Sequence, residues 1–392
     1  MPQYASRGNL PHKRHTQFRD GAGALLFEEM FTTHGFAGAY SLLYHVVPPT
    51  EVLQIRPGGV VLQEEWIPDV QRPHLFDSAD IAADGEVPDS RRAILFNDDL
   101  TLSVSAPSLA STAFYRNALC DEVSFIAAGT GEMASPFGVL RYGPGDMIVA
   151  PRGTIQAWRP AEGVAQRHLL LESATAISPP ARYFNPAGQF NFRSPIAERD
   201  VRLPELAPPC ADTGAFRLRV KHGLRLDEHV LARHPFDIVG WDGHLYPYAI
   251  NIDDFEPITR RVHTMPDENQ IFETCGAAIC CLVPRPLDFH PNAVPAPPYH
   301  MNVDVDEVVF NVGDRFMGWE RPALGVMTLH PRGLPHGSKP GLYEGSIGMK
   351  VFDGRAIMVD AARPLHLTMF AKSCDDATYP TAWLPAPVRR AS

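Results

Sequence analysis

The stretch from Pro298 to His336 contains two histidines and one glutamate, His300, Glu307 and His336, whose side chains could together bind a metal ion. Glu307 follows His300 by seven positions, and His336 comes after a second apolar run. Two imidazoles and one carboxylate are the ligand set of a mononuclear non-haem Fe(II) site. Such a set leaves three positions of an octahedral metal open, whereas a structural site would be closed. We therefore predict that these residues bind Fe(2+), with Mn(II) and Zn(II) as alternatives.

Other side chains in this stretch compete for the same assignments. Asp304 and Asp306 lie near Glu307, and Asp306 stands six positions after His300, which also suits a ligand pair. His330 either lines the site as a substrate-binding group or is a strand-end histidine bound by backbone. The alternative for His300 and His336 themselves is an ordinary core or surface position.

The elements that must hold these residues are predicted to be short β-strands. The chain has 392 residues, of which 38 are proline and 30 are glycine, and this density of breakers argues against long helices. Short apolar runs bounded by turn residues occur at 41–47, 58–66, 92–97, 101–107, 122–129, 138–143, 146–151, 167–173, 216–223, 277–288, 307–313, 325–331, 346–354 and 365–372. The pattern is typical of an all-β sandwich or barrel. A short helix is expected within residues 21–34.

The second half of the chain repeats the first, with changes at the candidate ligand positions. The corresponding positions are Tyr115 and His300, Glu122 and Glu307, and Gln156 and His336. In both halves Pro-Arg-Gly precedes the last of these positions by the same distance. The shared offset of the two glutamates favours Glu307 over its aspartate neighbours as the carboxylate ligand. A lone carboxylate does not hold a transition metal tightly, so the first half is predicted to keep the fold without the metal.

Composition excludes several classes of function. The formal net charge is −10 and no long basic run occurs, which argues against nucleic-acid binding. No apolar stretch approaches the roughly 18 to 20 residues of a membrane helix, and no signal peptide is recognised at the N-terminus. The 6 cysteines lack C-x2-C spacing, so neither a zinc finger nor a disulfide framework is indicated. We expect a cytoplasmic protein that has no membrane or nucleic-acid partner.

The repeated pattern resembles the two sequence motifs of the cupin family. The resemblance implies a tandem bicupin, with two antiparallel jelly-roll (double-stranded β-helix) barrels and few short helices. Asn302 stands where most cupins have a second histidine, which leaves the three ligands named above. Because residues 178–212 are Pro-rich and irregular, we expect a cupin-like domain with a degenerate metal site at 1–195. A second cupin domain, which carries the metal site, is expected at 196–392.

The chain also resembles one bicupin family closely, the homogentisate 1,2-dioxygenases. The stretches PHKRHTQFR, SLLYHVVPPT, VGWDGHLYPY, PPYHMNVDVDE, LHPRGLPHG and IMVDAARPLHLT carry this resemblance over most of the chain. Enzymes of this family use Fe(II) and O2 to open a hydroquinone-type ring in tyrosine and phenylalanine degradation. The resemblance implies an iron-dependent ring-cleaving dioxygenase for homogentisate or a gentisate-like acid. It also implies His300, Glu307 and His336 as iron ligands, and a homo-oligomer.

The same resemblance suggests further site residues. The family has a histidine that assists removal of the phenol proton upstream of the first iron ligand, and His263 is the one histidine in that segment here. Its alternative is an exposed loop histidine. Tyr299 and Phe316 are candidates for packing the ring, although either could equally be a core residue. Two positions depart from the family pattern, since Asn269 stands where a second histidine is expected and Phe316 where a tyrosine is expected.

Two other functions fit the same sequence. One is a cupin isomerase or hydrolase that uses Zn(II) or Mn(II). The other is a non-enzymatic bicupin that binds a small molecule, which loss of the metal triad would favour. The intact triad in the second half makes the dioxygenase our leading hypothesis.

Overall fold

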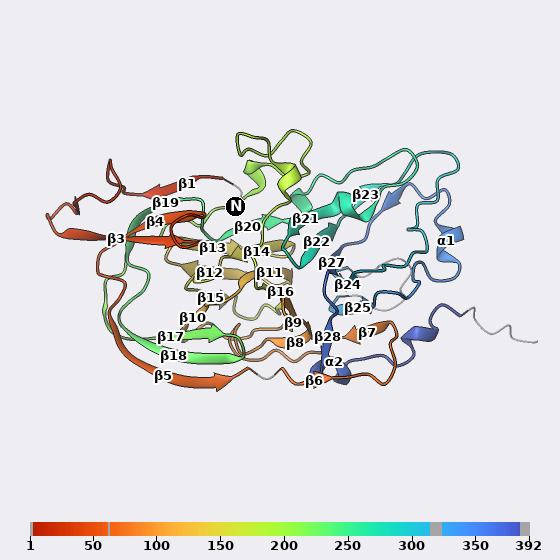
Figure 1. Cartoon of the computed structure of the whole chain (residues 1–392), viewed down its shortest axis with the longest axis horizontal. Coiled ribbons are helices and arrows are strands. Elements are labelled where there is room, and N and C mark those ends of the chain that lie inside the picture. The colour runs from red at the N-terminus through yellow and green to blue at the C-terminus, as the bar shows by residue number, and fades with distance from the viewer. Residues whose placement is uncertain (1–2, 62, 314–323, 385–392) are drawn as a thin grey trace, which may run out of the picture. The chain divides into compact units, whose positions relative to one another are not determined.

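The computed structural model describes residues 3–61, 63–313 and 324–384, and it confirms the predicted all-β fold (Figure 1). The α-helices in this part of the chain are α1 (Leu342–Gly345) and α2 (Met369–Ser373). Single turns of 3-10 helix occur at Ala181–Tyr183, Glu198–Asp200, Ile252–Asp254, Pro266–Asn269 and Tyr379–Thr381. The short helices agree with the limit that frequent proline and glycine residues set on helix length.

The first compact unit comprises Met1–Gln63, Ala82–Arg92 and Leu100–Asp254. Its strands are β1 (Ala5–Gly8), β2 (Phe18–Arg19), β3 (Leu25–Thr32), β4 (Tyr40–His45), β5 (Val52–Val60), β9 (Leu100–Ser105), β10 (Phe114–Asn117), β11 (Asp121–Ala128), β12 (Gly131–Ser135), β13 (Gly138–Tyr142), β14 (Asp146–Ala150), β15 (Ala157–Pro160), β16 (Arg167–Ser173), β17 (Thr213–His222), β18 (Arg225–Arg233), β19 (Ile238–Gly243) and β20 (Tyr248–Asn251). Its central sheet has the antiparallel order β20-β14-β11-β16-β9.

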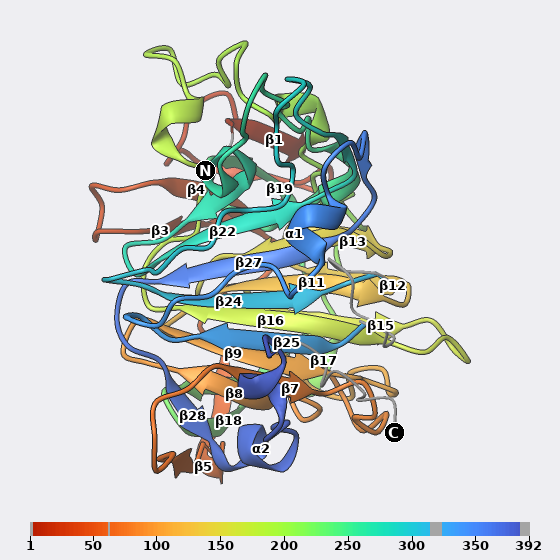
Figure 2. The same ribbon diagram turned by 90° about the vertical axis from the view of Figure 1, so that its right-hand side faces the viewer.

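The second unit comprises Glu64–Ile81, Ala93–Asp99 and Phe255–Ser392. Its strands are β6 (Glu65–Trp66), β7 (His74–Asp77), β8 (Arg92–Phe96), β21 (Gln270–Glu273), β22 (Ala277–Leu282), β23 (Arg285–Pro286), β24 (Asp306–Asn311), β25 (Val326–His330), β26 (Val351–Phe352), β27 (Ala356–Ala361) and β28 (His366–Thr368). Its central sheet has the order β21-β22-β27-β24-β25-β7, and Figure 2 shows β22, β27, β24 and β25 in succession.

Each central sheet contains a strand from the other half of the sequence. In the first unit β20, from the second half, pairs with β14, and in the second unit β7, from the first half, pairs with β25. The two compact units therefore interleave along the chain. The expected division at 195/196 falls inside the first unit, because β17 to β20 pair with N-terminal strands.

Some local predictions are wrong. Residues 21–34 hold the strand β3 instead of a helix, because this segment pairs with β4 and its Glu28 and Glu29 bond to groups on neighbouring segments. The run at 346–354 forms only the two-residue strand β26, and 365–372 divides between β28 and α2. The strand β27 was not among the predicted runs.

The internal repeat is confirmed in the backbone. Tyr115 and Gln156 form an isolated antiparallel bridge in the first unit, and His300 and His336 form the same bridge in the second. Asp306 of the second unit accepts hydrogen bonds from the backbone and side chain of Arg332, and Asp121 of the first unit binds Arg152 in the same way. The duplicated frame is the tandem bicupin architecture that the sequence predicts.

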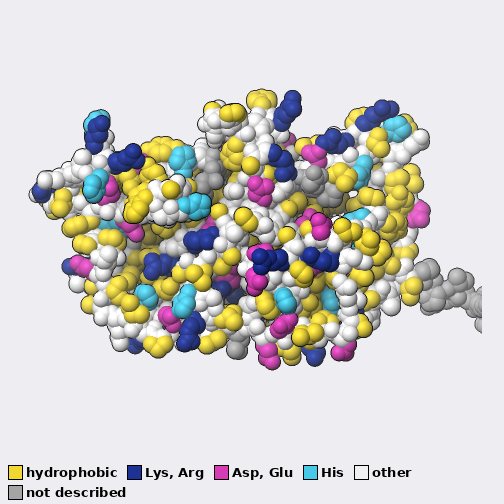
Figure 3. All heavy atoms as spheres, viewed as in Figure 1, with side chains coloured by type: hydrophobic (Ala, Val, Ile, Leu, Met, Phe, Trp, Pro, Cys, Tyr) yellow, Lys and Arg dark blue, Asp and Glu magenta, His cyan; other side chains and the backbone are white. Residues whose placement is uncertain are grey.

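The surface agrees with the acidic, evenly charged composition. On the face in Figure 3, Lys and Arg side chains are interspersed with Asp and Glu and form no continuous basic patch. Among the described residues, no helix is both long enough and apolar enough to cross a membrane.

Candidate metal centre

The three candidate ligands reach one point from a strand and two loops. Glu307 lies near the start of β24, and alternation along the strand puts its side chain on the same face as the buried Val309. His300 and His336 lie in the loops that precede β24 and follow β25, and each donates a backbone hydrogen bond to the carbonyl of the other, at 2.9 and 2.8 Å. The loop before His336 turns at Gly333, whose φ of 79° favours glycine.

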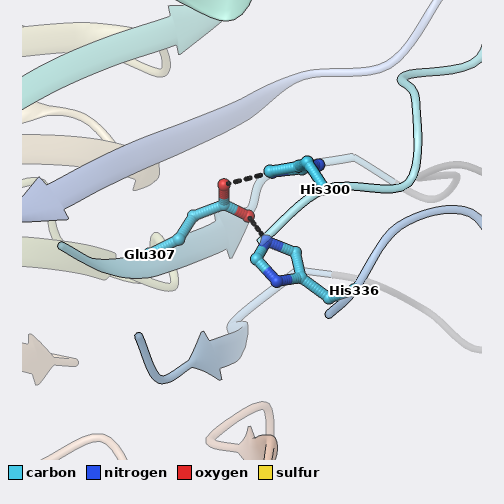
Figure 4. A group of neighbouring side chains, drawn as sticks. All are labelled: His300, Glu307 and His336. Atoms are coloured by element: carbon cyan, nitrogen blue, oxygen red, sulfur yellow. Dashed lines mark hydrogen bonds and ion pairs between the residues drawn. The ribbon is translucent and has the colours of Figure 1, made fainter. Parts of the chain in front are cut away.

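The imidazole rings of the triad present their Nε2 atoms to the carboxylate (Figure 4). Glu307 Oε2 lies 3.4 Å from His300 Nε2, and Oε1 lies 3.5 Å from His336 Nε2. The Nδ1 atoms donate to the backbone carbonyls of Pro298 and Leu334, both at 3.0 Å. A carbonyl oxygen can only accept, so these bonds require hydrogen on Nδ1 and leave the Nε2 lone pairs available in the neutral rings.

The donor set fits a divalent metal ion. Within the described part of the chain, these residues form the one group of three or more His, Cys, Asp or Glu side chains that could hold a metal, with ligand atoms within 4.8 Å of one another. His336 Nε2 is buried and makes no hydrogen bond. Neutral imidazole nitrogen and carboxylate oxygen suit Fe(II), Mn(II) or Zn(II).

Electrostatics tie the triad together. Burial opposes ionisation of Glu307, but the neighbouring imidazoles of His300, His330 and His336 outweigh it and hold the pKa of this carboxyl well below its usual range. The hydrogen bond to Glu307 raises the pKa of His300. A metal bound at His300 Nε2 would displace the proton shared with Glu307, since imidazole binds metals in its neutral form.

The competing aspartates have other positions. Asp306 binds Arg332 through Oδ1 and the backbone N–H of Leu365 through Oδ2, at 2.7 Å, so its carboxylate joins three segments of the frame. Asp304 is exposed.

His330 lies next to Glu307 in the sheet. The two residues are register partners on β25 and β24, and His330 Nδ1 lies 3.3 Å from Glu307 Oε1. His330 Nε2 lies 2.9 Å from the hydroxyl of the buried Tyr379, and its ring stacks on His336 at 4.4 Å. This bonding holds Oε1 of the Glu307 carboxylate in place.

Tyr379 and Trp383 were not identified as site residues from the sequence. Their rings pack edge to face at 5.0 Å, and Trp383 Nε1 donates to the carbonyl of Gly337, next to His336. Two aromatic residues in a short Pro-rich segment were the available signal, because exposed irregular tails seldom retain them.

Asp360 was also missed. It lies on β27 directly opposite Glu307, so both carboxylates stand on one face of the sheet. Burial raises the pKa of Asp360 to about 7, and the charge of Glu307 adds to this effect.

The structure does not bring every predicted site residue to the triad. Tyr299 is 56% exposed and stacks on Tyr343 at 5.6 Å. His263 is partly buried and has no hydrogen bond, ion pair or ring contact with the triad among the described residues. Asn269 is buried, and Phe316 lies outside the described residues.

The matching position of the first unit is built differently. Glu122 is buried and accepts hydrogen bonds from the Arg91 guanidinium at 2.6 Å, the Tyr115 hydroxyl at 2.8 Å and the Gln156 amide at 3.1 Å. Burial opposes ionisation of Glu122, but the charge of Arg91 lowers its pKa to about 2. Arg91 therefore supplies the positive charge beside this carboxylate.

Comparison with known proteins places the chain in a family. A Saccharolobus solfataricus protein that is provisionally named a dioxygenase is 36% identical over 388 residues, which cover 98% of this chain and 99% of that protein. The chain belongs to the same family as this relative. No family model matches the chain.

More distant relatives are homogentisate 1,2-dioxygenases. The enzyme from Rhodopseudomonas palustris strain BisB5 is 26% identical over 63% of this chain and 57% of its own length. The enzyme from Bradyrhizobium diazoefficiens is 27% identical over 67% of this chain and 60% of its own length. The chain thus spans less than two thirds of these enzymes.

Solved structures resemble the chain only weakly. Protein YlbA from E. coli has 7% identity and a TM-score of 0.35, and covers 78% of this chain and 96% of its own. Bacillus subtilis oxalate decarboxylase has 10% identity and a TM-score of 0.34, and covers 83% of this chain and 82% of its own.

Proposed function

We propose that this protein is a mononuclear Fe(II) dioxygenase that cleaves the ring of homogentisate or a related hydroquinone or gentisate-like acid. The observation that carries the proposal is the triad, in which both Nδ1 atoms bind backbone and both Nε2 atoms face one carboxylate. The full-length relationship to a protein named a dioxygenase, and the partial relationship to homogentisate dioxygenases, support the reaction class.

The triad would hold the iron and leave one side of it to the reactants. His300, Glu307 and His336 are the proposed ligands, and Fe(II), when bound, would supply open positions where a ring hydroxyl and O2 meet. His330 keeps Glu307 in position through Nδ1 and is itself held by the hydroxyl of Tyr379. Both oxygen atoms of O2 would enter the product as a ring carbon–carbon bond breaks.

Three further residues, His263, Tyr299 and Phe316, are proposed to act on the substrate. His263 is proposed to take the phenol proton, and its buried Nε2 has no hydrogen-bond partner in the part of the chain that the structure describes. Tyr299 and Phe316 are proposed to contact the substrate. Tyr299 adjoins His300 in the chain, and its exposed ring is available to a molecule that enters from solvent.

The test is anaerobic reconstitution followed by measurement of O2 consumption. Protein loaded with one Fe(II) per chain is mixed with homogentisate, gentisate or hydroquinone, and air-saturated buffer is added. We expect one O2 consumed per substrate and a product heavier by two oxygen atoms. No uptake with any of these compounds, in protein with full iron content, would contradict the proposal.

The same preparation separates the alternatives. An isomerase or hydrolase that uses Zn(II) or Mn(II) would turn over under argon, whereas a ring-cleaving dioxygenase requires O2. We also propose a homo-oligomer, on the strength of the family resemblance, and sedimentation of the iron-loaded protein tests it.

A further inference from the structure

Asp360 has a buried carboxylate oxygen for which the described part of the chain offers no donor. Its Oδ1 is buried and makes no hydrogen bond. The register Glu307–Asp360 across β24 and β27 puts both carboxylates on one face, at the end of the apolar layer formed by Cys280, Val309 and Met358. A buried carboxylate oxygen without a donor costs free energy, so this position calls for a partner that the described residues do not supply.

The first unit shows what the same position looks like when it is satisfied. There Glu122 pairs in register with Glu172. Glu172 accepts hydrogen bonds from Asn117 at 2.7 Å and from Lys221, and lies 3.5 Å from Arg91. Both copies therefore keep an acidic residue opposite the motif glutamate, and among the described residues the first copy supplies donors to both of its glutamates whereas Asp360 Oδ1 receives none.

Asp360 is not placed as a direct metal ligand. Asp360 is not part of the group of side chains whose ligand atoms lie within 4.8 Å of one another, which His300, Glu307 and His336 complete. It still interacts electrostatically with all three of them. A carboxylate at this place can accept a hydrogen bond from a hydroxyl group that is bound beside the triad.

We propose that Asp360 is a substrate-binding residue whose Oδ1 accepts a hydrogen bond from the ring hydroxyl of the aromatic substrate at the metal. This inference rests on the proposed function, because it needs a hydroxylated ring at the triad. It adds a specificity requirement, since a ring without a hydroxyl hydrogen at that place leaves Asp360 unpaired. A hydrogen bond to this carboxyl group accounts for roughly tenfold in affinity.

The test compares Asp360→Asn with the wild type and with Asp304→Asn, which removes the same charge from an exposed position in the neighbouring loop. Under argon, each protein is titrated first with Fe(II) and then with homogentisate, followed by calorimetry. We expect one Fe(II) per chain in all three proteins. We expect homogentisate to bind Asp360→Asn about tenfold more weakly or worse, and Asp304→Asn as it binds the wild type.

Three other results would overturn the role of Asp360. Equal homogentisate affinity in Asp360→Asn and wild type would overturn the role of Asp360 and leave the proposed function intact. Loss of Fe(II) from Asp360→Asn would overturn it in favour of direct metal ligation. Failure of iron-loaded wild type to bind homogentisate, gentisate or hydroquinone would overturn both proposals together.

The unfolding temperature of the metal-free proteins distinguishes a substrate-binding role of Asp360 from a structural one. Because Asp360 lacks a donor, Asp360→Asn is expected to unfold at the same temperature as the wild type or higher. A clearly lower unfolding temperature would mean that the carboxylate stabilises the fold, and would refute the substrate-binding role.

Discussion

The two units place a glutamate at corresponding positions of their own central sheets and surround it with different side chains. In the first unit Glu122 meets Arg91, Tyr115 and Gln156. In the second unit Glu307 meets two histidines whose Nε2 atoms face it and whose Nδ1 atoms are held by backbone. A buried carboxylate needs a positive partner in either case. The first unit balances its carboxylate with the internal Arg91 guanidinium, and we propose that the second unit balances Glu307 with a bound metal cation.

The largest expected effect is on the metal site itself. His336→Ala removes a proposed ligand whose Nε2 has no hydrogen-bond partner among the described residues, and we expect metal binding and O2 consumption to fall below detection. Metal content by elemental analysis after Fe(II) loading measures the result. His12→Ala, at an exposed histidine, is the control and should keep one metal per chain. Unchanged metal content in His336→Ala would mean that the ligand assignment is wrong.

The second prediction concerns the stability of the first unit, where Arg91 neutralises the buried carboxylates. Arg91→Met leaves Glu122 and Glu172 buried without their guanidinium, and we expect a loss of about 3–5 kcal/mol in the free energy of unfolding. Urea denaturation at pH 7 measures it. Arg141→Met removes a 70% exposed arginine from the same unit and should cost less than about 1 kcal/mol. Equal stability of Arg91→Met and the wild type would show that Arg91 does not neutralise the pair.

Acid should narrow the gap between Arg91→Met and the wild type. The wild-type Glu122 has a pKa lowered to about 2, so its contribution is present above its ordinary pKa of 4.5 and is lost as pH falls toward 2. Without Arg91, burial instead raises the pKa of Glu122, so protonation relieves the variant as pH falls from 7. We expect the difference in unfolding free energy to shrink by on the order of 2 kcal/mol between pH 7 and pH 4.5. A constant difference across this range would argue against the charge mechanism.

The smallest change in metal affinity is expected at Tyr379, which positions Glu307 through His330. Tyr379→Phe removes the hydroxyl that lies 2.9 Å from His330 Nε2, and we expect metal affinity to fall about 10- to 100-fold with one site per chain retained. Competition titration with a chelator measures the affinity. Tyr343→Phe, at a ring that stacks on Tyr299, serves as the matched control and should bind metal as the wild type does. An affinity that stays at the wild-type value in Tyr379→Phe would remove this tyrosine from the site.

The sequence by itself determined the all-β class, the duplication and the three candidate ligands. A high density of proline and glycine limits helix length, which indicates the all-β class. Equal spacing of residues in the two halves indicates positions with the same local fold, so both features can be recognised from the sequence alone. The same spacing favoured Glu307 over Asp306, and the tertiary structure adds the reason, because Asp306 is engaged by Arg332 in the frame.

Only the tertiary structure decided which distant residues complete each site. Arg91 and Lys221 reach Glu122 and Glu172 from separate segments, and Tyr379 reaches His330 from the C-terminal segment. Asp360 became visible only through the strand register that sets β27 against β24. Such pairings depend on which strands lie side by side, and strand order, including the exchange of β7 and β20 between the halves, leaves no local signature in the sequence.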